Sequence, residues 1–448
     1  MIPLLKGLLV IELLHRTQFG MSVSVHYLFA PLSVSLALVM LLVEGFWLKT
    51  GNPVWKKSFD FWRSIFATNF AIGVATGIPL IFAFGLNWSR YAAFVGPTIG
   101  PLFAQEAIFA FTLEAGFLGL CLYGEKILSA KLHFVTTFFV FLGAHLSAFF
   151  ITAANSWMQT PKGFVLTMQS QMQTTCPTRF SDILFNPSAL THFSHLVLAA
   201  WLVGFFLIVA ICAFYAQKNH HLDFATKNLK MAFTAIAITL VLLLASADTL
   251  ARNIAVNNPT KMAAFEGVYK TAPNTPMYLI GWPDSSQKRV HGIAAKSFLS
   301  LLVHRDKNIP VTGLDQTPQS LWPNIAIVFC CYHLMVGLFF IMALQLGAAF
   351  FLFCKKSYKS HPWLMWGILL SPITASLANL MGWYTTEFGR QPWVVNKLLK
   401  TASAYSDQVT VLQAAISFAF TIIFLALAIS LFIYLLMQKI KKGPENIS

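Results

Sequence analysis

Nine apolar stretches, each long enough to cross a lipid bilayer, divide this chain of 448 residues. A transmembrane helix needs about 20 mostly apolar residues to span a hydrocarbon core roughly 30 Å thick. Only 10% of the residues are charged, against roughly 25% in soluble proteins, which argues against a soluble fold. The predicted spans are 19–48, 62–84, 102–122, 132–156, 189–216, 228–250, 323–354, 363–385 and 412–438.

Lysines gather in the short segments between alternate spans, and this placement predicts the orientation of the chain. They lie at 49–57, 126–131, 218–227, 355–359 and 439–442. Because short cytoplasmic segments carry an excess of Lys and Arg, we expect these segments and the C-terminus in the cytoplasm, and the N-terminus outside. The formal net charge of +15 then reflects membrane orientation, and nucleic acid is excluded as a partner.

The spans predict three parts along the chain. Residues 1–250 contain the first six spans, residues 251–322 form a long extracytoplasmic segment with six prolines, and residues 323–448 contain the last three spans. Long segments of this kind are usually functional or disordered. The sequence has no evident internal repeat, which argues against a secondary transporter built from inverted repeats.

Seven ionisable side chains within or beside the predicted spans are selected as candidates. Each is a candidate functional residue, because an ionisable group in hydrocarbon is costly unless it is paired, solvated or bound to a metal. For His26 the alternatives are a buried histidine satisfied by a hydroxyl and an axial haem ligand. For His195 the alternative to a ligand is an interfacial histidine. The seven are His26, Glu106, Glu114, His145, His195, His333 and Glu387.

Two of the candidate carboxylates lie on the third span. Glu106 and Glu114 are eight residues apart, which in an α-helix is about 12 Å along the axis and about 80° around it. Both can therefore face the interior of one bundle. With no basic partner on the same helix, they indicate a proton relay or an iron ligand, although Glu106 also has the position of a helix-end glutamate near solvent.

The end of the eighth span has a distinctive polar sequence, GWYTTEFGRQPW at residues 382–393. Glu387 and Arg390 are three residues apart and so share a helix face. One interpretation is an interfacial ion pair between tryptophan anchors, which needs no cofactor. The other is a cofactor site.

The chain resembles subunit I of the cytochrome bd quinol oxidases over nearly its whole length. The resemblance rests on RTQF at 16–19 with His26, NFAIGVATG at 69–77, NW at 87–88, NSWMQ at 155–159 and GRQPW at 389–393. It implies an all-α polytopic membrane protein with about nine transmembrane helices. These would form two four-helix bundles and one peripheral helix, with a long extracytoplasmic quinol loop.

The resemblance implies two b haems, one low-spin and one high-spin, and one chlorin haem d, without copper. His195 and Met335 correspond to the axial pair of the low-spin b haem, a ligation that raises haem potential. His26 corresponds to the haem d ligand and Glu387 to the high-spin b ligand, although family members exchange these two haems. Glu106 is a candidate sixth ligand in the same pocket. The sequence has no C-x-x-C-H motif, so haem would be bound without thioether links.

Further roles follow from the same resemblance. Glu106 and Glu114 correspond to a proton path from the cytoplasm, and Trp383 to a residue between haems. Arg16 and Arg390 correspond to residues that face haem propionates. His333, also predicted to contact a cofactor, stands where the family has Arg, and His192 stands where it has Lys. Both replacements would weaken propionate neutralisation and lower the potential of the low-spin haem.

The outer segment corresponds to the quinol-oxidation site of the family. Lys261 and Glu266 match its central part, and Gly281, Pro283 and Asp284 match a further piece. Quinol oxidation releases two protons, so a carboxylate base is needed there. We expect Lys261 and Glu266 in a water-facing loop, away from the haems.

The implied activity is an electrogenic quinol:oxygen oxidoreductase of a bacterial inner membrane. It would oxidise ubiquinol or menaquinol and reduce O₂ to water. Chemical protons would come from the cytoplasm and quinol protons would leave outside, so proton-motive force arises by charge separation without a pump. The implied partners are the bilayer, a second subunit (subunit II) in a heterodimer, and small accessory membrane subunits.

Three alternatives are weighed against this function. A haem-copper oxidase needs an adjacent histidine pair in a helix for copper, but the pair His220 and His221 lies in a predicted cytoplasmic segment. The second alternative is another haem-bearing membrane electron carrier. A secondary transporter with buried carboxylates, the third, would be colourless when purified.

Overall fold

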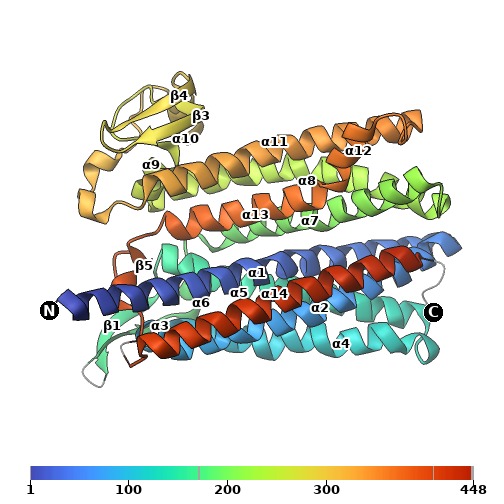
Figure 1. Cartoon of the computed structure of the whole chain (residues 1–448), viewed down its shortest axis with the longest axis horizontal. Coiled ribbons are helices and arrows are strands. Elements are labelled where there is room, and N and C mark those ends of the chain that lie inside the picture. The colour runs from blue at the N-terminus through green and yellow to red at the C-terminus, as the bar shows by residue number, and fades with distance from the viewer. Residues whose placement is uncertain (1, 170–171, 407, 445–448) are drawn as a thin grey trace.

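Long helices lying side by side dominate the computed structural model of the chain (Figure 1), which describes residues 2–169, 172–406 and 408–444. In these residues eight helices are long and apolar enough to cross a membrane, and a ninth span is a pair of helices bent by 44°. The predicted number of spans is therefore confirmed. The spans are α1 (Ile2–Thr50), α2 (Pro53–Leu86), the run of α3 (Ser89–Gln105), η1 (Glu106–Phe111) and α4 (Thr112–Tyr123), α5 (Ala130–Gln159), α7 (Ala189–Lys218), α8 (Leu222–Asn257), α11 (Ile325–Lys355), the bent pair α12 (Pro362–Leu369) and α13 (Ser371–Phe388), and α14 (Val411–Lys442).

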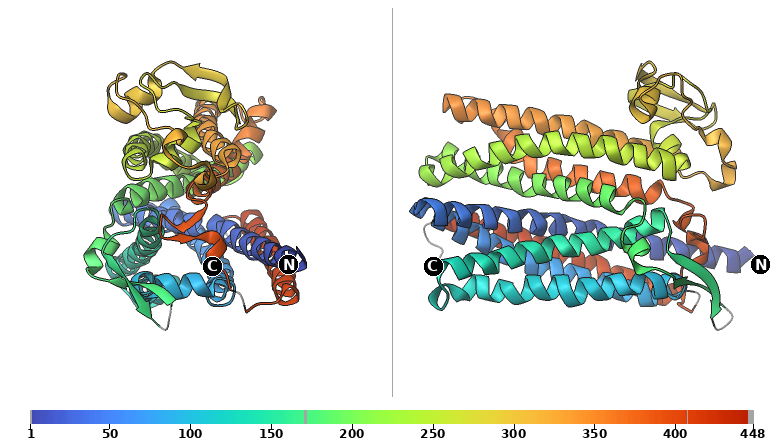
Figure 2. Two further views of the ribbon diagram at one scale, coloured as in Figure 1. Left: turned by 90° about the vertical axis from the view of Figure 1, so that its left-hand side faces the viewer. Right: turned by 180° about the vertical axis from the view of Figure 1, so that it is seen from behind.

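The spans form two groups of four and one outer helix, as the fold class predicts (Figure 2). The first group contains α1, α2, the α3–α4 run and α5, and the second contains α7, α8, α11 and the α12–α13 pair. Helix α14 packs outside the first group, against α1 and α2. Helix α7 contacts α1 and α5 as well as α8 and α13, so it joins the two groups.

The first span begins earlier than the sequence predicts, because its polar residues find partners inside the bundle. Helix α1 starts at Ile2 and not near residue 19. His15 Nδ1 and Gln18 Oε1 both lie against the Asn87 amide, at 2.8 and 3.0 Å, and the Gln18 amide donates to Thr421 Oγ1 at 3.0 Å. Polar groups satisfied in this way do not have to interrupt a membrane helix.

The extracytoplasmic segment 251–322 is folded into short elements. Helix α8 continues to Asn257, beyond the predicted boundary at 250. The segment continues with α9 (Pro259–Glu266), the antiparallel pair β3 (Met277–Asp284) and β4 (Arg289–Ala295), and α10 (Phe298–His304). Figure 1 shows these elements together at the end of the bundle where the N-terminus lies.

The remaining short elements lie in the other connections. The strands β1 (Phe164–Gln169) and β2 (Met172–Pro177) form a second antiparallel hairpin, which is followed by α6 (Phe180–Leu184). The strands β5 (Trp393–Val395) and β6 (Leu399–Lys400) pair after α13. The chain therefore leaves the eighth span through a structured turn.

Gly143 allows α5 to approach α4 closely, and this contact gives a stability prediction. A Cβ atom at residue 143 would lie 2.6 Å from Glu114 N and 2.8 Å from Ala110 O. Because backbone cannot move aside cheaply, we expect Gly143→Ala to lower the free energy of unfolding by about 1–3 kcal/mol. Thermal unfolding in detergent measures this. Gly116→Ala is the control, since a Cβ there meets no described atom within 4 Å. Equal stability of the two variants would contradict the prediction.

Candidate functional site

His195 is oriented by a hydroxyl that fixes the protonation of its ring. Its Nδ1 lies 3.1 Å from Ser246 Oγ, and Ser246 donates its own proton to the Leu243 carbonyl at 2.9 Å. Because that hydroxyl has only one proton, it accepts from His195, which places the proton on Nδ1. The Nε2 lone pair is then available to a metal, as in histidines held by a partner on the opposite nitrogen.

His26 has the same arrangement in the first bundle. Its Nδ1 lies 3.2 Å from Thr76 Oγ1, and Thr76 donates to the Gly73 carbonyl at 3.0 Å. A Cβ atom on Gly77 would lie 3.2 Å from His26 Cε1, so glycine leaves room for the ring. The two hydroxyl partners were not identified from the sequence.

His145 differs from both, because each of its nitrogens has a protein partner. Its Nδ1 donates to the Phe141 carbonyl at 2.8 Å, and its Nε2 accepts from Trp201 Nε1 at 3.1 Å. No lone pair remains for a metal. We therefore assign His145 to helix packing between α5 and α7.

Met335 lies opposite a glycine in the second bundle. A Cβ atom on Gly382 of α13 would lie 2.9 Å from Met335 Sδ on α11. Trp383 follows that glycine, with its ring centroid 6.3 Å from the Tyr27 ring of α1. The tryptophan therefore stands where the two bundles meet.

The end of α13 places Glu387 in a polar network that includes an unsatisfied arginine. Glu387 Oε1 accepts from Asn155 Nδ2 at 2.8 Å, and Oε2 pairs with Arg390. Arg390 is only 4% exposed, and its Nε and Nη1 have no hydrogen-bond partner among the described residues. Buried guanidinium donors need hydrogen-bond acceptors, and an anionic group such as the predicted haem propionate would supply them.

Arg16 is less enclosed than Arg390. Its guanidinium donates to Glu12 Oε1 at 3.0 Å and to Gln391 Oε1 at 3.2 Å, and its side chain is 40% exposed. It thus approaches the turn that follows Arg390. A contact with a propionate stays a prediction.

Glu106 and Glu114 lie on nearly one face of the third span, which corrects the angle expected from the sequence. The backbone from Glu106 to Phe111 is a π-helical turn. Such a turn holds about one extra residue, so about 20° and not about 80° separates the two side chains. Ser147 Oγ donates to Glu106 Oε1 at 2.7 Å, whereas Glu114 is 6% exposed and its Oε1 has no partner in the described chain.

Lys261 and Glu266 are buried, so the expectation of a water-facing position is wrong for both. They are 2% and 1% exposed. Lys261 Nζ donates to Gln159 Oε1 at 3.3 Å, and a Cβ atom on Gly389 would lie 2.9 Å from Lys261 Cγ. The lysine therefore runs along the turn that carries Arg390, close to Glu387, one of the predicted haem ligands.

The protein surroundings shift the pKa values of Lys261 and Glu266 into the neutral pH range. Burial lowers the pKa of Lys261 to about 7, while the Glu387 carboxylate raises it and Arg390 lowers it further. Burial also raises the pKa of Glu266 to about 7, and a hydrogen bond from Tyr332 partly opposes this shift. Each group can therefore exchange a proton near neutral pH.

His333 connects α11 with the β3–β4 hairpin. Its Nδ1 and Nε2 each lie 2.9 Å from a backbone carbonyl oxygen, of Phe329 and Tyr278 respectively. The imidazole thus holds the outer hairpin on the span that carries Met335. Its predicted contact with a cofactor stays a prediction, as does the quinol-site role of Gly281, Pro283 and Asp284 in the hairpin.

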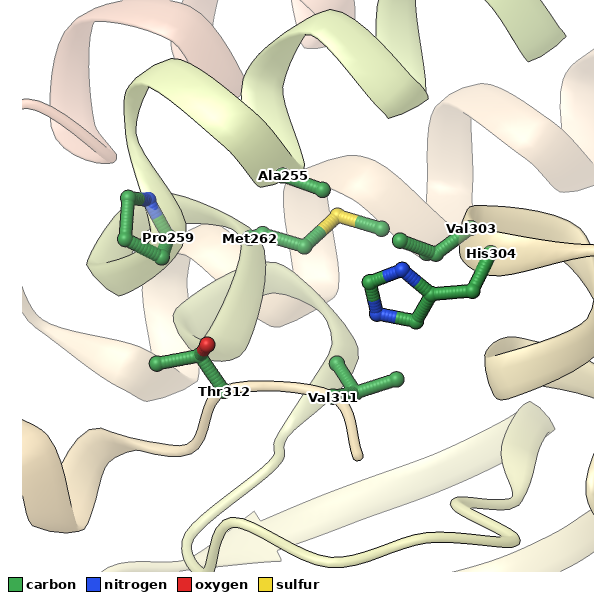
Figure 3. A pocket seen from close by; sticks show the side chains of 7 residues that line it. All are labelled: Ala255, Pro259, Met262, Val303, His304, Val311 and Thr312. Atoms are coloured by element: carbon green, nitrogen blue, oxygen red, sulfur yellow. The ribbon is translucent and has the colours of Figure 1, made fainter. Parts of the chain in front are cut away.

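A small hollow lies beside α9, on the side where α10 packs. Its cavity volume is about 20 Å³, enough for about one water molecule and too little for a quinol ring. Figure 3 shows Met262 and His304 in its wall. The lining residues are Ala255, Pro259, Met262, Val303, His304, Val311 and Thr312.

Comparison with known proteins places this arrangement in one family. A subunit 1 of cytochrome bd ubiquinol oxidase from Bacillus subtilis is 31% identical, over 97% of this chain and 94% of its own. The cytochrome bd-II ubiquinol oxidase subunit 1 of Escherichia coli is 28% identical, over 96% of each chain.

The fold is also that of a solved oxidase. The bd oxidase structure from Geobacillus thermodenitrificans matches with a TM-score of 0.85 and 23% identity, over 96% of this chain and 98% of that one. Residues 14–444 match the family described as cytochrome bd terminal oxidase subunit I. The chain therefore belongs to the cytochrome bd terminal oxidase subunit I family.

Proposed function

We propose that this chain oxidises membrane quinol and reduces O₂ to water, as the names of its relatives describe for those proteins. The observation that carries the proposal is that His26 and His195, in different bundles, each present a free Nε2 lone pair. Arg390 has two buried donors without a partner among the described residues, and it supplies a complementary site for an acidic cofactor edge.

The residues would hold three haems in the way the family resemblance implies. His195 and Met335 would ligate a low-spin b haem, His26 a haem d, and Glu387 a high-spin b haem, with Glu106 as a sixth ligand. When bound, these groups supply electron transfer and the site of O₂ reduction. Arg390, together with Arg16, would neutralise propionates, and Trp383 would fill the space between haems.

Quinol would be oxidised at the outer end of the second bundle. Lys261 and Glu266 are buried there and titrate near neutral pH. The Glu266 carboxylate would accept a quinol proton, and Lys261 would orient the quinol oxygen by hydrogen bonding. Segment 251–322 is thus the quinol-oxidation part between two haem-binding parts, 1–250 and 323–448.

Protons for water formation would enter from the opposite side. Glu114 and Glu106 share one face of the third span, and lysines mark the other end of the bundle as cytoplasmic. The N-terminus and the quinol segment would then be extracytoplasmic in a bacterial inner membrane. Proton uptake from the cytoplasm and release of quinol protons outside would separate charge across the membrane without a proton pump.

A partner membrane subunit is expected beside the first bundle. Helix α14 carries an outward row of apolar side chains spaced by three or four residues, and each is at least 61% exposed. Such an apolar row can pack against lipid or against another membrane subunit. We propose that subunit II of a heterodimer covers it and that small accessory subunits also bind the chain. The row consists of Leu412, Ile416, Phe420, Ile423 and Leu427.

A reduced-minus-oxidised optical spectrum of the purified complex tests the proposed cofactors. We expect bands of two b haems and a chlorin, together with quinol-dependent O₂ consumption by the same preparation. A colourless preparation would contradict the whole proposal. Activity with ubiquinol and with menaquinol, compared in parallel, identifies the quinone.

Replacing Glu266 tests the quinol site through pH. Since the pKa of Glu266 is raised to about 7, its carboxylate form increases as pH rises through that value. We expect kcat/KM for quinol to rise about tenfold between pH 6 and pH 8 in the native enzyme, and Glu266→Gln to be slow and nearly flat over this range.

The control separates chemistry from folding. A carboxyl whose folded pKa lies above its ordinary value favours the folded state at low pH, and this contribution is lost as pH rises through about 7. Gln is neutral throughout, so the variant should keep its stability and all haem bands. Asp306→Asn, an exposed acid of the same segment, should retain the native profile. Loss of haem bands in Glu266→Gln would show a structural role instead.

A further inference from the structure

The buried pair of Glu44 on α1 and His133 on α5 has no part in the functions described so far. Glu44 is fully buried and His133 is 2% exposed. Glu44 Oε1 lies 2.6 Å from His133 Nδ1, and Glu44 Oε2 has no partner in the described part of the chain. Both residues lie at the end of the bundle opposite the quinol segment. A carboxylate kept in such a place indicates a functional role.

The hydrogen bonds of His133 leave one proton free to move. Its Nε2 lies 3.0 Å from the Cys121 carbonyl, which accepts only, so Nε2 carries a proton. The contact between Nδ1 and Glu44 can then hold its proton on either partner. A hydrogen-bonded pair whose shared proton can lie on either partner transfers that proton by a small shift between the two atoms, and neither side chain has to rotate.

A cluster of ion pairs lies between this buried pair and the solvent-exposed Glu125. Arg63 donates to the Cys121 carbonyl at 2.8 Å and to Glu125 at 2.7 Å, and it also pairs with Asp60 at 2.9 Å. The Glu125 side chain is 36% exposed. The Cys121 carbonyl accepts from Arg63 and lies against His133, so the buried pair lies next to carboxylates that can exchange protons with water.

Beyond the pair, contacts between α5 and the third span continue toward the proposed O₂ site. Thr137 Oγ1 lies 3.5 Å from Cys121 Sγ, one helical turn beyond His133. Gly143 then brings α5 against the backbone of Glu114, and Ser147 donates to Glu106. Each of these α5 residues contacts the third span, so the interface between that span and α5 leads from the buried pair to both glutamates.

We propose that Glu44 and His133 form the entry relay that delivers cytoplasmic protons to Glu114. Glu44 takes a proton through His133, and its unpartnered Oε2 passes the proton inward through mobile water. No bond other than those to the moving proton changes. The proposal rests on the proposed function, because it supplies the protons that O₂ reduction consumes.

The test is Glu44→Gln in the intact complex, with two readouts. We expect O₂ turnover and the rate of proton uptake, followed with a pH dye after O₂ is mixed with the reduced enzyme, to fall at least tenfold. Haem spectra and the rate of haem reduction by quinol without O₂ should stay native, which separates this proposal from the quinol-oxidase function. Absence of haem reduction in the native enzyme would overturn the function itself.

Matched variants distinguish a relay from a structural pair. Glu44→Asp should restore much of the uptake rate, and Glu44→Gln with His133→Gln should be no slower than either single variant, since both act in one path. Asp223→Asn, an exposed acid at the start of α8, should be native in every readout. Native proton uptake in Glu44→Gln, or multiplied losses in the double variant, would overturn the relay.

Discussion

Glu114→Gln should reduce O₂ turnover at least tenfold while the optical spectrum stays native. The side chain is 6% exposed and shares a helix face with Glu106 because of the π-helical turn between them. In hydrocarbon, protons move only through titratable groups or trapped water, and Gln keeps the shape of Glu but cannot exchange a proton. Steady-state O₂ consumption and absorption spectra of the same sample measure both effects.

Glu106→Gln supplies the contrast. Ser147 donates to the Glu106 carboxylate at 2.7 Å, and we place that carboxylate in the O₂-reducing pocket. Its replacement should therefore change the spectrum of that pocket as well as the rate. Full activity in Glu114→Gln would contradict the relay role of Glu114. Identical spectra in the two variants would contradict the placement of Glu106 beside the haem iron.

Met335→Leu should convert the low-spin b haem to a high-spin form and reduce quinol oxidation at least tenfold. Leu keeps the apolar volume but removes the thioether, and swaps of this kind usually cost under about 1.5 kcal/mol of stability. The complex should therefore assemble. The α-band of the low-spin haem and its paramagnetic resonance signal report the loss of the ligand.

Met342→Leu is the matched control for this variant. Met342 lies two turns further along α11 and is 3% exposed, so the same substitution is made in a buried site of the same helix. It should leave the spectrum and activity native. An unchanged low-spin signal in Met335→Leu would refute the assignment of Met335 as a ligand.

Hydropathy predicts the number and order of the spans but not where the helices end. It marks only the part of a helix that lies in hydrocarbon, whereas α3 continues outward to Ser89, well before the predicted start at 102. The hairpin β3–β4 was not predicted, since strands of seven or eight residues with mixed exposure have little periodicity. Short elements of this kind are decided by contacts with the rest of the protein.

For the candidate site too, the sequence predicts part of the arrangement, and contacts between distant segments decide the rest. The residue types of His26, His195 and Glu387, within or beside apolar runs, were sufficient to select them as candidates. The π-helical turn at Glu106 was not predicted from the sequence. The burial of Lys261 depends on α9 folding back against Gly389. Glu44 and His133 lie inside predicted spans and could have been selected by the same rule, but their pairing needed the contact between α1 and α5.

The hydroxyls of Ser246 and Thr76 have a consequence for how the holoenzyme is assembled. Each already gives its proton to a carbonyl of its own helix, so the neighbouring histidine keeps its proton on Nδ1. An arriving haem iron then meets a lone pair already available on Nε2, and coordination releases no proton into the bilayer. Maturation of the subunit at these two positions should therefore depend on haem supply and access, and little on the pH of the compartment.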